Sequence, residues 1–164
     1  WVNAAIVSRR NLRRRKAQTY SESLSHNQYS IMRVFLDTNV ILDLIQRRVG
    51  YDDAALIMQK SENGVYSLFT SSLSMVNIAY ILRKYYRGES LYHLLEELGD
   101  IMGVITVSSE AYHKALQSRA LDFEDAIQLF SAIESDMDCI VTRNAQDFIF
   151  DKLPIFTPFD FLNR

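Results

Sequence analysis

The stretch Val34-Phe-Leu-Asp-Thr-Asn-Val-Ile-Leu-Asp43 changes from an apolar strand pattern to an apolar helix pattern, with a polar turn between the two. Residues 33–36 are typical of a short buried strand, and residues 40–46 are typical of a short helix. The polar residues 37–39 lie where the predicted strand ends. This order predicts the first strand and helix of a parallel α/β sheet.

The alternation of strand and helix patterns continues to the end of the chain. We predict further strands at 65–69, 104–107, 139–141 and 155–156, and helices at 52–63, 74–86, 91–98, 108–119, 123–135 and, as a single turn, 144–148. Helices between strands imply a mostly parallel, twisted sheet of about five strands with helices on both faces. The helix at 74–86 is apolar nearly all round, so we expect it to be central.

The composition predicts one soluble domain of ordinary size. The chain has 164 residues, of which 48% are hydrophobic and 23% charged, as in globular proteins. Cys139 is the one cysteine, so no internal disulfide can form, which fits the reducing cytoplasm. No apolar run of about 18 residues occurs, and we therefore expect no membrane-spanning segment.

The net charge of −2 hides two different regions. Residues 1–31 contain six Arg or Lys and one Glu, whereas residues 32–164 contain 12 Arg or Lys and 19 Asp or Glu. We therefore expect a basic, disordered N-terminal extension over 1–31 and an acidic domain over 32–164. An acidic domain is a poor non-specific binder of nucleic acid, but it can house a cation that reverses the local charge.

Three aspartates are candidate ligands for such a cation. Asp37 follows the first strand, Asp147 lies shortly after the strand at 139–141, and Asp125 lies in the first turn of the helix at 123–135. Ligands bind at the carboxyl ends of parallel strands, and clustered carboxylates that would otherwise repel suit Mg²⁺ or Mn²⁺. Each also has a structural alternative, as a helix cap or as a surface charge.

Other polar residues in these segments also have two interpretations. Asp122 is placed to cap the helix at 123–135, and Glu124 to serve either as a surface charge or in the site. Asn77 lies within an apolar helix, where its amide either completes the polar site or forms hydrogen bonds inside the core. For holding a polyanion, the candidate basic residues are Arg143, after the fourth strand, and Arg83, Lys84 and Arg87, at the end of the apolar helix.

Three motifs resemble the PIN-domain family, and within it the VapC-like toxins of bacterial toxin–antitoxin pairs. They are residues 34–43, then Phe123-Glu-Asp-Ala-Ile-Gln128, then Val141-Thr-Arg-Asn-Ala-Gln-Asp-Phe148. The resemblance covers about residues 32–162. It implies a three-layer fold and an endoribonuclease that uses Mg²⁺ or Mn²⁺ to cut RNA with an activated water. It also implies an antitoxin as partner, and it allows a homodimer.

The resemblance also assigns roles to residues. Asp37, Asp125 and Asp147 would be the catalytic carboxylates that hold the metal ion, with Glu124 as a further candidate ligand. The polar residues supporting them would be Asn39, Asn77, Thr142 and Asn144.

One position departs from the family pattern. The family usually has a Glu on the helix after the second strand, where this chain has Asn77. Either Glu124 or Asp43 compensates for the lost charge, or metal affinity and activity are lower. The alternative function is therefore a non-catalytic RNA- or protein-binding module with a weakened metal site. A phosphatase with an aspartyl nucleophile is disfavoured, because Asp37 lacks a second acid two residues later.

Overall fold

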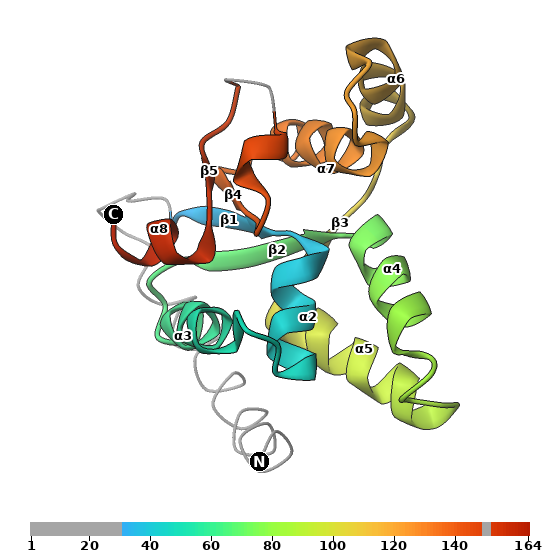
Figure 1. Cartoon of the computed structure of the whole chain (residues 1–164), viewed down its shortest axis with the longest axis vertical. Helices are drawn as coiled ribbons and strands as arrows, with labels where there is room; N and C mark the ends of the chain where they lie inside the picture. The colour runs from blue at the N-terminus through green and yellow to red at the C-terminus, as the bar shows by residue number, and fades with distance from the viewer. Residues whose placement is uncertain (1–30, 149–151) are drawn as a thin grey trace, which may run out of the picture. The chain divides into compact units, whose positions relative to one another are not determined.

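The computed structural model describes residues 31–148 and 152–164 (Figure 1). The predicted basic extension over 1–31 lies outside these residues except for Ile31. One compact unit runs from Ile31 to Arg164.

A five-stranded parallel sheet forms the centre of this unit, as predicted. The strands are β1 (Arg33–Leu36), β2 (Ser67–Ser71), β3 (Gly103–Ile105), β4 (Cys139–Val141) and β5 (Ile155–Phe156). Their order across the sheet is β3-β2-β1-β4-β5, so that β1 is the central strand. Val34 of β1 pairs with Leu68 on one side and with Cys139 on the other.

Helices cover both faces of the sheet, and the fold has the three layers that we predicted. Figure 1 shows α6 and α7 on one side, and α2, α3 and α5 on the other. The helices are α2 (Thr38–Gln46), α3 (Tyr51–Glu62), α4 (Ser72–Leu82), α5 (Glu89–Ile101), α6 (Ser109–Ser118), α7 (Phe123–Glu134), α8 (Pro158–Leu162) and the 3₁₀ helix η1 (Ala145–Asp147). None of the helices among the described residues combines the length and the apolar character that crossing a bilayer requires.

The alternation of side chains along β1 divides the core between the two faces. Val34 and Leu36 pack into the larger apolar cluster, with residues from α2, α3, α4 and α5. Phe35 points to the opposite face, where it packs with Leu129 of α7 and Ile140 of β4. A strand buried on both sides is apolar throughout, which explains the continuous apolar run of this segment.

Several boundaries differ from the sequence-based predictions. β2 begins at Ser67 rather than at residue 65, because Val65 is exposed after a turn at Gly64, which has a φ of 79°. β3 also begins and ends earlier than predicted, and α5 is longer at both ends. Helix α8 was not predicted; it begins with Pro158, and the Thr157 hydroxyl caps it by accepting the Asp160 N–H (3.1 Å).

Our prediction that the apolar helix after β2 is central is wrong. Helix α4 buries Ser74, Ile78 and Leu82, but Val76 and Tyr80 are 64% and 63% exposed. The helix therefore buries one face only, and its other face presents apolar side chains to solvent. It also ends at Leu82, earlier than predicted.

Two glycines should respond in opposite directions to substitution by alanine. A Cβ at Gly103 would lie 2.5 Å from Cδ1 of Phe69, whose ring is covered by the Arg33 guanidinium at 4.3 Å. Gly103→Ala should therefore lower the free energy of unfolding by about 1–3 kcal/mol. A Cβ at Gly99 in α5 meets nothing within 4 Å, so Gly99→Ala should raise it by about 0.5–1 kcal/mol. Urea titrations of both variants measure this, and changes of the same sign would contradict the packing at Gly103.

Candidate functional site

Asp37 is buried where the central strand ends. It lies between β1 and α2, its side chain is 4% exposed, and its backbone N–H donates to Val141 O (3.0 Å) at the end of β4. The carboxylate Oδ2 accepts a hydrogen bond from the Thr142 hydroxyl (3.0 Å). The side chain makes no capping hydrogen bond to α2. The hydrogen bond that orients the Asp37 carboxylate therefore comes from the loop after the neighbouring strand.

Thr142 is oriented by the loop that follows β4. Its hydroxyl accepts the backbone N–H of Asn144 (3.2 Å) and is almost fully buried. Because this N–H occupies a lone pair of the oxygen, the hydroxyl proton is directed at Asp37. Asn144 thus contacts Thr142 through its backbone, while its side chain is exposed.

Glu124 forms the second acidic part of the site, together with two amides. Its Oε1 accepts from Asn77 Nδ2 (2.6 Å) and from Gln128 Nε2 (3.1 Å). Gln128 is buried, and its Oε1 accepts from the hydroxyl of Ser74 (3.3 Å). These hydrogen bonds join α4 to α7, and they place the Asn77 amide beside the Glu124 carboxylate.

Burial affects the protonation of both acids, Asp37 and Glu124, and the charge of Asp37 also affects Glu124. Burial raises the pKa of Asp37, while the Thr142 hydroxyl, the nearby backbone amides of residues 38–39 and the Gln128 amide oppose the rise. Burial also raises the pKa of Glu124; the Asn77 amide opposes it, and the negative charges of Asp37 and Asp122 raise it further. The site therefore holds two partly desolvated carboxylates that repel each other, which a bound cation would relieve.

The structure describes the surroundings of the other predicted acids to different extents. Asp122 caps α7, as predicted, with Oδ1 accepting the N–H groups of Glu124 (2.8 Å) and Asp125 (3.1 Å). Asp125 is half-buried in the first turn of the same helix. The side chain of Asp147 lies outside the described part of the chain, so the convergence of Asp37, Asp125 and Asp147 stays a prediction. Among the described side chains, no three His, Cys, Asp or Glu form a ready metal cluster.

Asp43 and Arg143 form an ion pair beside the site. Asp43 Oδ1 accepts from Arg143 Nη1 (3.1 Å); the aspartate side chain is 1% exposed and that of the arginine 45%. The other oxygen, Oδ2, is buried and has no hydrogen-bond partner among the described residues. Gly50 lies so close to this oxygen that a Cβ at position 50 would overlap it. Asp43 thus pairs with Arg143, and Glu124 is the acid that lies beside Asn77.

The remaining predicted residues lie at the ends of two helices. Asn39 is half-buried in the first turn of α2. The guanidinium of Arg83 stacks on the ring of Tyr80 (3.8 Å), and the ammonium of Lys84 lies 4.9 Å from the Tyr85 ring centre. Arg83, Lys84 and Arg87 are exposed. Arg83 follows Asn77 by six residues, so these basic residues begin roughly 9 Å further along the axis of α4.

Gln128 was missed as a site residue by sequence reasoning, although it belongs to a quoted motif. It is a polar residue within the otherwise apolar run Ala126–Phe130, one helical turn after Glu124. A buried amide needs hydrogen-bond partners, so this position was a signal for a polar cluster on α7.

Comparison with known proteins places the chain in a family. The model of the PIN domain family matches residues 33–146, and the chain belongs to this family. No curated protein matches the chain significantly in sequence.

Several solved structures share the fold. DNA-bound VapBC from Salmonella typhimurium is 17% identical, with a TM-score of 0.59 over 78% of this chain and 99% of that chain. A toxin–antitoxin complex from Klebsiella pneumoniae is 21% identical, with a TM-score of 0.58 over 77% and 98%. A sarcin–ricin loop cleaving toxin from Mycobacterium tuberculosis is 14% identical, with a TM-score of 0.51 over 65% and 86%.

Asp37→Asn should stabilise the metal-free protein at neutral pH. The folded protein holds the Asp37 proton more tightly than the unfolded chain, because the folded pKa is raised above 3.8. Stability therefore falls as the pH rises from 3.8 through the raised pKa. The variant should gain about 0.5–2 kcal/mol near pH 7, and this gain should shrink towards acidic pH. Urea titrations in EDTA at several pH values measure it.

Asp52→Asn provides the control for this charge change. Asp52 is exposed in the first turn of α3, where its charge is favoured by the helix dipole, so this substitution should lower stability by about 0.3–1 kcal/mol. If the Asp37→Asn variant is less stable than the parent at pH 7, burial is not the main influence on the pKa of Asp37.

A double-mutant cycle should reveal coupling between Asp43 and Arg143. Arg143→Met leaves the buried Asp43 charge unpaired, which should cost about 3–5 kcal/mol of unfolding free energy. In the Asp43→Asn background the same change should cost much less, since no buried charge remains. Chemical denaturation of the four proteins gives the coupling energy. Additive effects would mean that the pair contributes nothing to stability.

Proposed function

We propose that this chain is a divalent-metal-dependent endoribonuclease and the toxin of a toxin–antitoxin pair. The observation that carries the proposal is the pair formed by the buried carboxylate of Asp37 and the half-buried carboxylate of Glu124, in which the charge of Asp37 raises the pKa of Glu124. They lie at the end of the central parallel strand and at the start of α7, in a chain of the PIN-domain family.

The donor set of this site fits a hard divalent cation. Asp37 and Glu124 supply carboxylate oxygens in partly desolvated positions, and their repulsion favours cation binding. The residues that would hold the ion are Asp37, Asp125 and Asp147, with Glu124 beside them. Oxygen ligands of this kind suit Mg²⁺ or Mn²⁺. When bound, such an ion lowers the pKa of a coordinated water and offsets the charge that develops on the phosphate.

Asn77 acts in this proposal as a positioning residue for Glu124. Its Nδ2 lies 2.6 Å from Glu124 Oε1, so the amide fixes the carboxylate of α7 from the side of α4. The family pattern places an acid at position 77 itself. In this chain the acid beside that position comes from α7, and the amide replaces charge repulsion with a hydrogen bond.

An antitoxin and RNA are the proposed partners. The structures with the same fold include a toxin–antitoxin complex, a DNA-bound VapBC and a toxin that cleaves the sarcin–ricin loop. The exposed side chains of Val76 and Tyr80 on α4 offer an apolar surface that a protein partner or a second copy could bury. The alternative is a non-catalytic binding module, which the amide at Asn77 favours because it removes one ligand charge.

Asp125→Asn tests the metal site and the function together. The change keeps the shape and removes one charge and one ligand. Mn²⁺ should stabilise the parent by about 2.7 kcal/mol at a hundredfold excess over its dissociation constant, but the variant by much less. Cleavage of RNA by the variant should fall by orders of magnitude. Thermal melts with and without Mn²⁺, together with an RNA cleavage assay, measure both effects.

Asp122→Asn is the matched control for this experiment. It removes the same charge three residues earlier, and Asn is as good a helix cap as Asp. This variant should still cleave RNA and should respond to Mn²⁺ far more strongly than Asp125→Asn, although somewhat less than the parent, because the charge of Asp122 acts on Glu124 but Asp122 is not a proposed ligand. A parent that binds RNA but neither responds to Mn²⁺ nor cleaves would instead support the binding-module alternative.

A further inference from the structure

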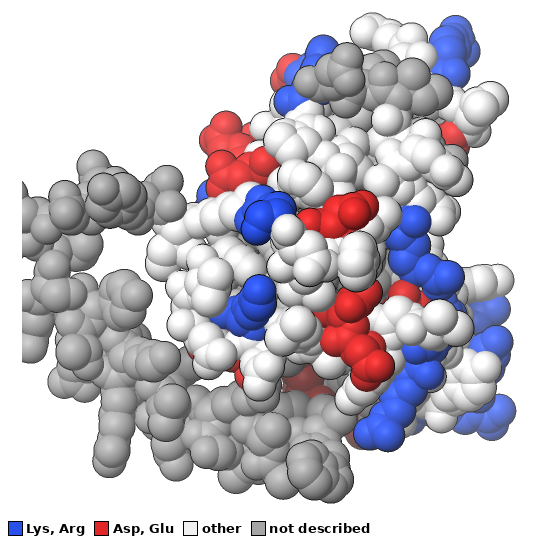
Figure 2. Space-filling model, turned by 60° about the vertical axis from the view of Figure 1, so that its left-hand side comes forward, with Lys and Arg blue, Asp and Glu red and all other residues white. Residues whose placement is uncertain are grey.

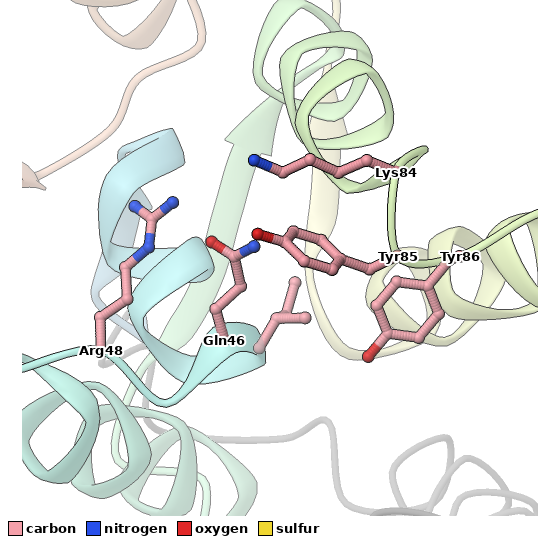
Figure 3. Close-up of a pocket in the computed structure, with 6 residues that line it drawn as sticks. Gln46, Arg48, Lys84, Tyr85 and Tyr86 are labelled. Carbon is pink, nitrogen blue, oxygen red and sulfur yellow. The ribbon is translucent and has the colours of Figure 1, made fainter.

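A cavity of about 620 Å³ lies where α2 and α4 both end. Its lining residues are Ile45, Gln46, Arg48, Lys84, Tyr85 and Tyr86. In Figure 3, Arg48 and Lys84 extend into it from opposite sides, with the Gln46 amide and the Tyr85 ring between them. The volume lies within the range of sites that take small ligands, about 300–1,000 Å³.

Positive charge gathers around this cavity although the domain is acidic. Five of the 12 basic residues in 32–164 lie in the two segments 47–48 and 83–87, which follow α2 and α4. Figure 2 shows basic side chains collected at the lower right of its view, beside acidic ones. Among the described residues, neither Arg48 nor Lys84 forms an ion pair with a carboxylate. The cavity therefore favours an anion.

Compensation of the helix dipoles explains only part of this charge. Arg47 and Arg83 occupy the C-cap positions of α2 and α4, where cations are favoured. Arg48 and Lys84 follow these caps and line the cavity instead. Their backbone positions are fixed, since the Arg48 N–H donates to Asp43 O (3.1 Å) and α4 ends in a hydrogen-bonded turn.

The aromatic side chains that line the cavity indicate which class of anion it could bind. Tyr85 and Tyr86 donate their backbone N–H groups to Leu82 O (2.8 and 2.9 Å), so the turn fixes the backbone from which both rings extend. Tyr85 is 64% exposed, so that a flat partner can reach its ring although the Lys84 ammonium lies 4.9 Å from the ring centre. Nucleic-acid bases stack on such rings while cations hold the phosphates. The side-chain amide of Gln46 offers both a donor and an acceptor to a base edge.

The cavity and the acidic site lie at opposite ends of α2. Helix α2 begins directly after Asp37 and ends at Gln46, which lines the cavity. A helix of nine residues is roughly 13 Å long. One extended strand of RNA can span this distance with a few nucleotides.

We propose that this cavity binds one nucleotide of a single-stranded RNA, a few positions from the bond that is cut. Arg48 and Lys84 hold the phosphate, and Tyr85 stacks on the base. The inference rests on the proposed function, because it places the nucleotide on the strand that reaches Asp37. An acidic segment of a protein partner would use the two cations but would not need the exposed ring.

Binding of a short single-stranded RNA to the full chain in EDTA tests this directly, because no cleavage occurs without a divalent ion. Fluorescence anisotropy at several salt concentrations gives the affinity and its salt dependence. The double variant Arg48→Gln/Lys84→Gln should bind more weakly, and its log–log salt slope should be smaller by about 0.7 for each phosphate that the protein no longer neutralises. Tyr85→Leu should weaken binding about fivefold to a hundredfold, whereas Tyr85→Phe should keep it.

Matched controls separate the cavity from general charge. Arg47→Gln removes the same charge beside Arg48 but outside the cavity, and should change affinity less than either cavity substitution. An RNA backbone without bases should be insensitive to Tyr85→Leu. Affinity unchanged in the double variant, or reduced only as far as in Arg47→Gln, would overturn the proposal, and so would a parent that binds no RNA.

Two further results distinguish this inference from the proposed function. If the double variant weakens binding of a Glu-rich peptide and not of RNA, the cavity is a protein-docking site and the proposal fails. If the cavity variants weaken RNA binding but the parent never cleaves with Mn²⁺, the nuclease assignment fails and the nucleotide site stands. If instead the parent cleaves RNA while the cavity variants bind RNA as tightly as the parent, the nuclease assignment stands and the nucleotide site fails.

Discussion

The carboxylate of Asp37 lies in the interior of the domain, at the end of the central strand, and burial disfavours its charged form. The rest of the site compensates for this burial. Strand β4 pairs beside β1 and brings Thr142 to within 3.0 Å of the carboxylate, and the loop after β4 directs the hydroxyl proton. The parallel order of the strands is what allows residues 105 positions apart to meet.

A second acid near Asp37 makes the region suitable for a cation. The family pattern usually has a Glu on α4, but this chain has Asn77 there, hydrogen-bonded to Glu124 of α7. The amide and the carboxylate attract each other, whereas two carboxylates at this separation would repel. With Asn77 on α4, the acid of this pair lies on α7, and its hydrogen bond joins the two helices.

Charges of opposite sign are separated along the two helices α2 and α4. Asp37 precedes α2 and Asn77 contacts Glu124 from α4, whereas Arg48 and Lys84 follow the C-terminal ends of these helices. A substrate with phosphates would meet the basic ends first, since the remainder of the domain is acidic. This separation of charge suits a single-stranded nucleic acid whose phosphates contact the basic ends of the helices and whose chain continues to the acidic site.

Local pattern by itself determined the five parallel strands, the polar turn at Asp37 and the cap at Asp122, because side-chain periodicity and capping act between residues close in sequence. The start of β2 and the exposed face of α4 were wrongly predicted, since packing decides which apolar residues are buried. Only the tertiary structure paired Asn77 with Glu124, and Asp43 with Arg143 100 residues away. It alone brought Arg48 and Lys84 to one cavity. Such contacts depend on where the sheet places its helices, which no local pattern encodes.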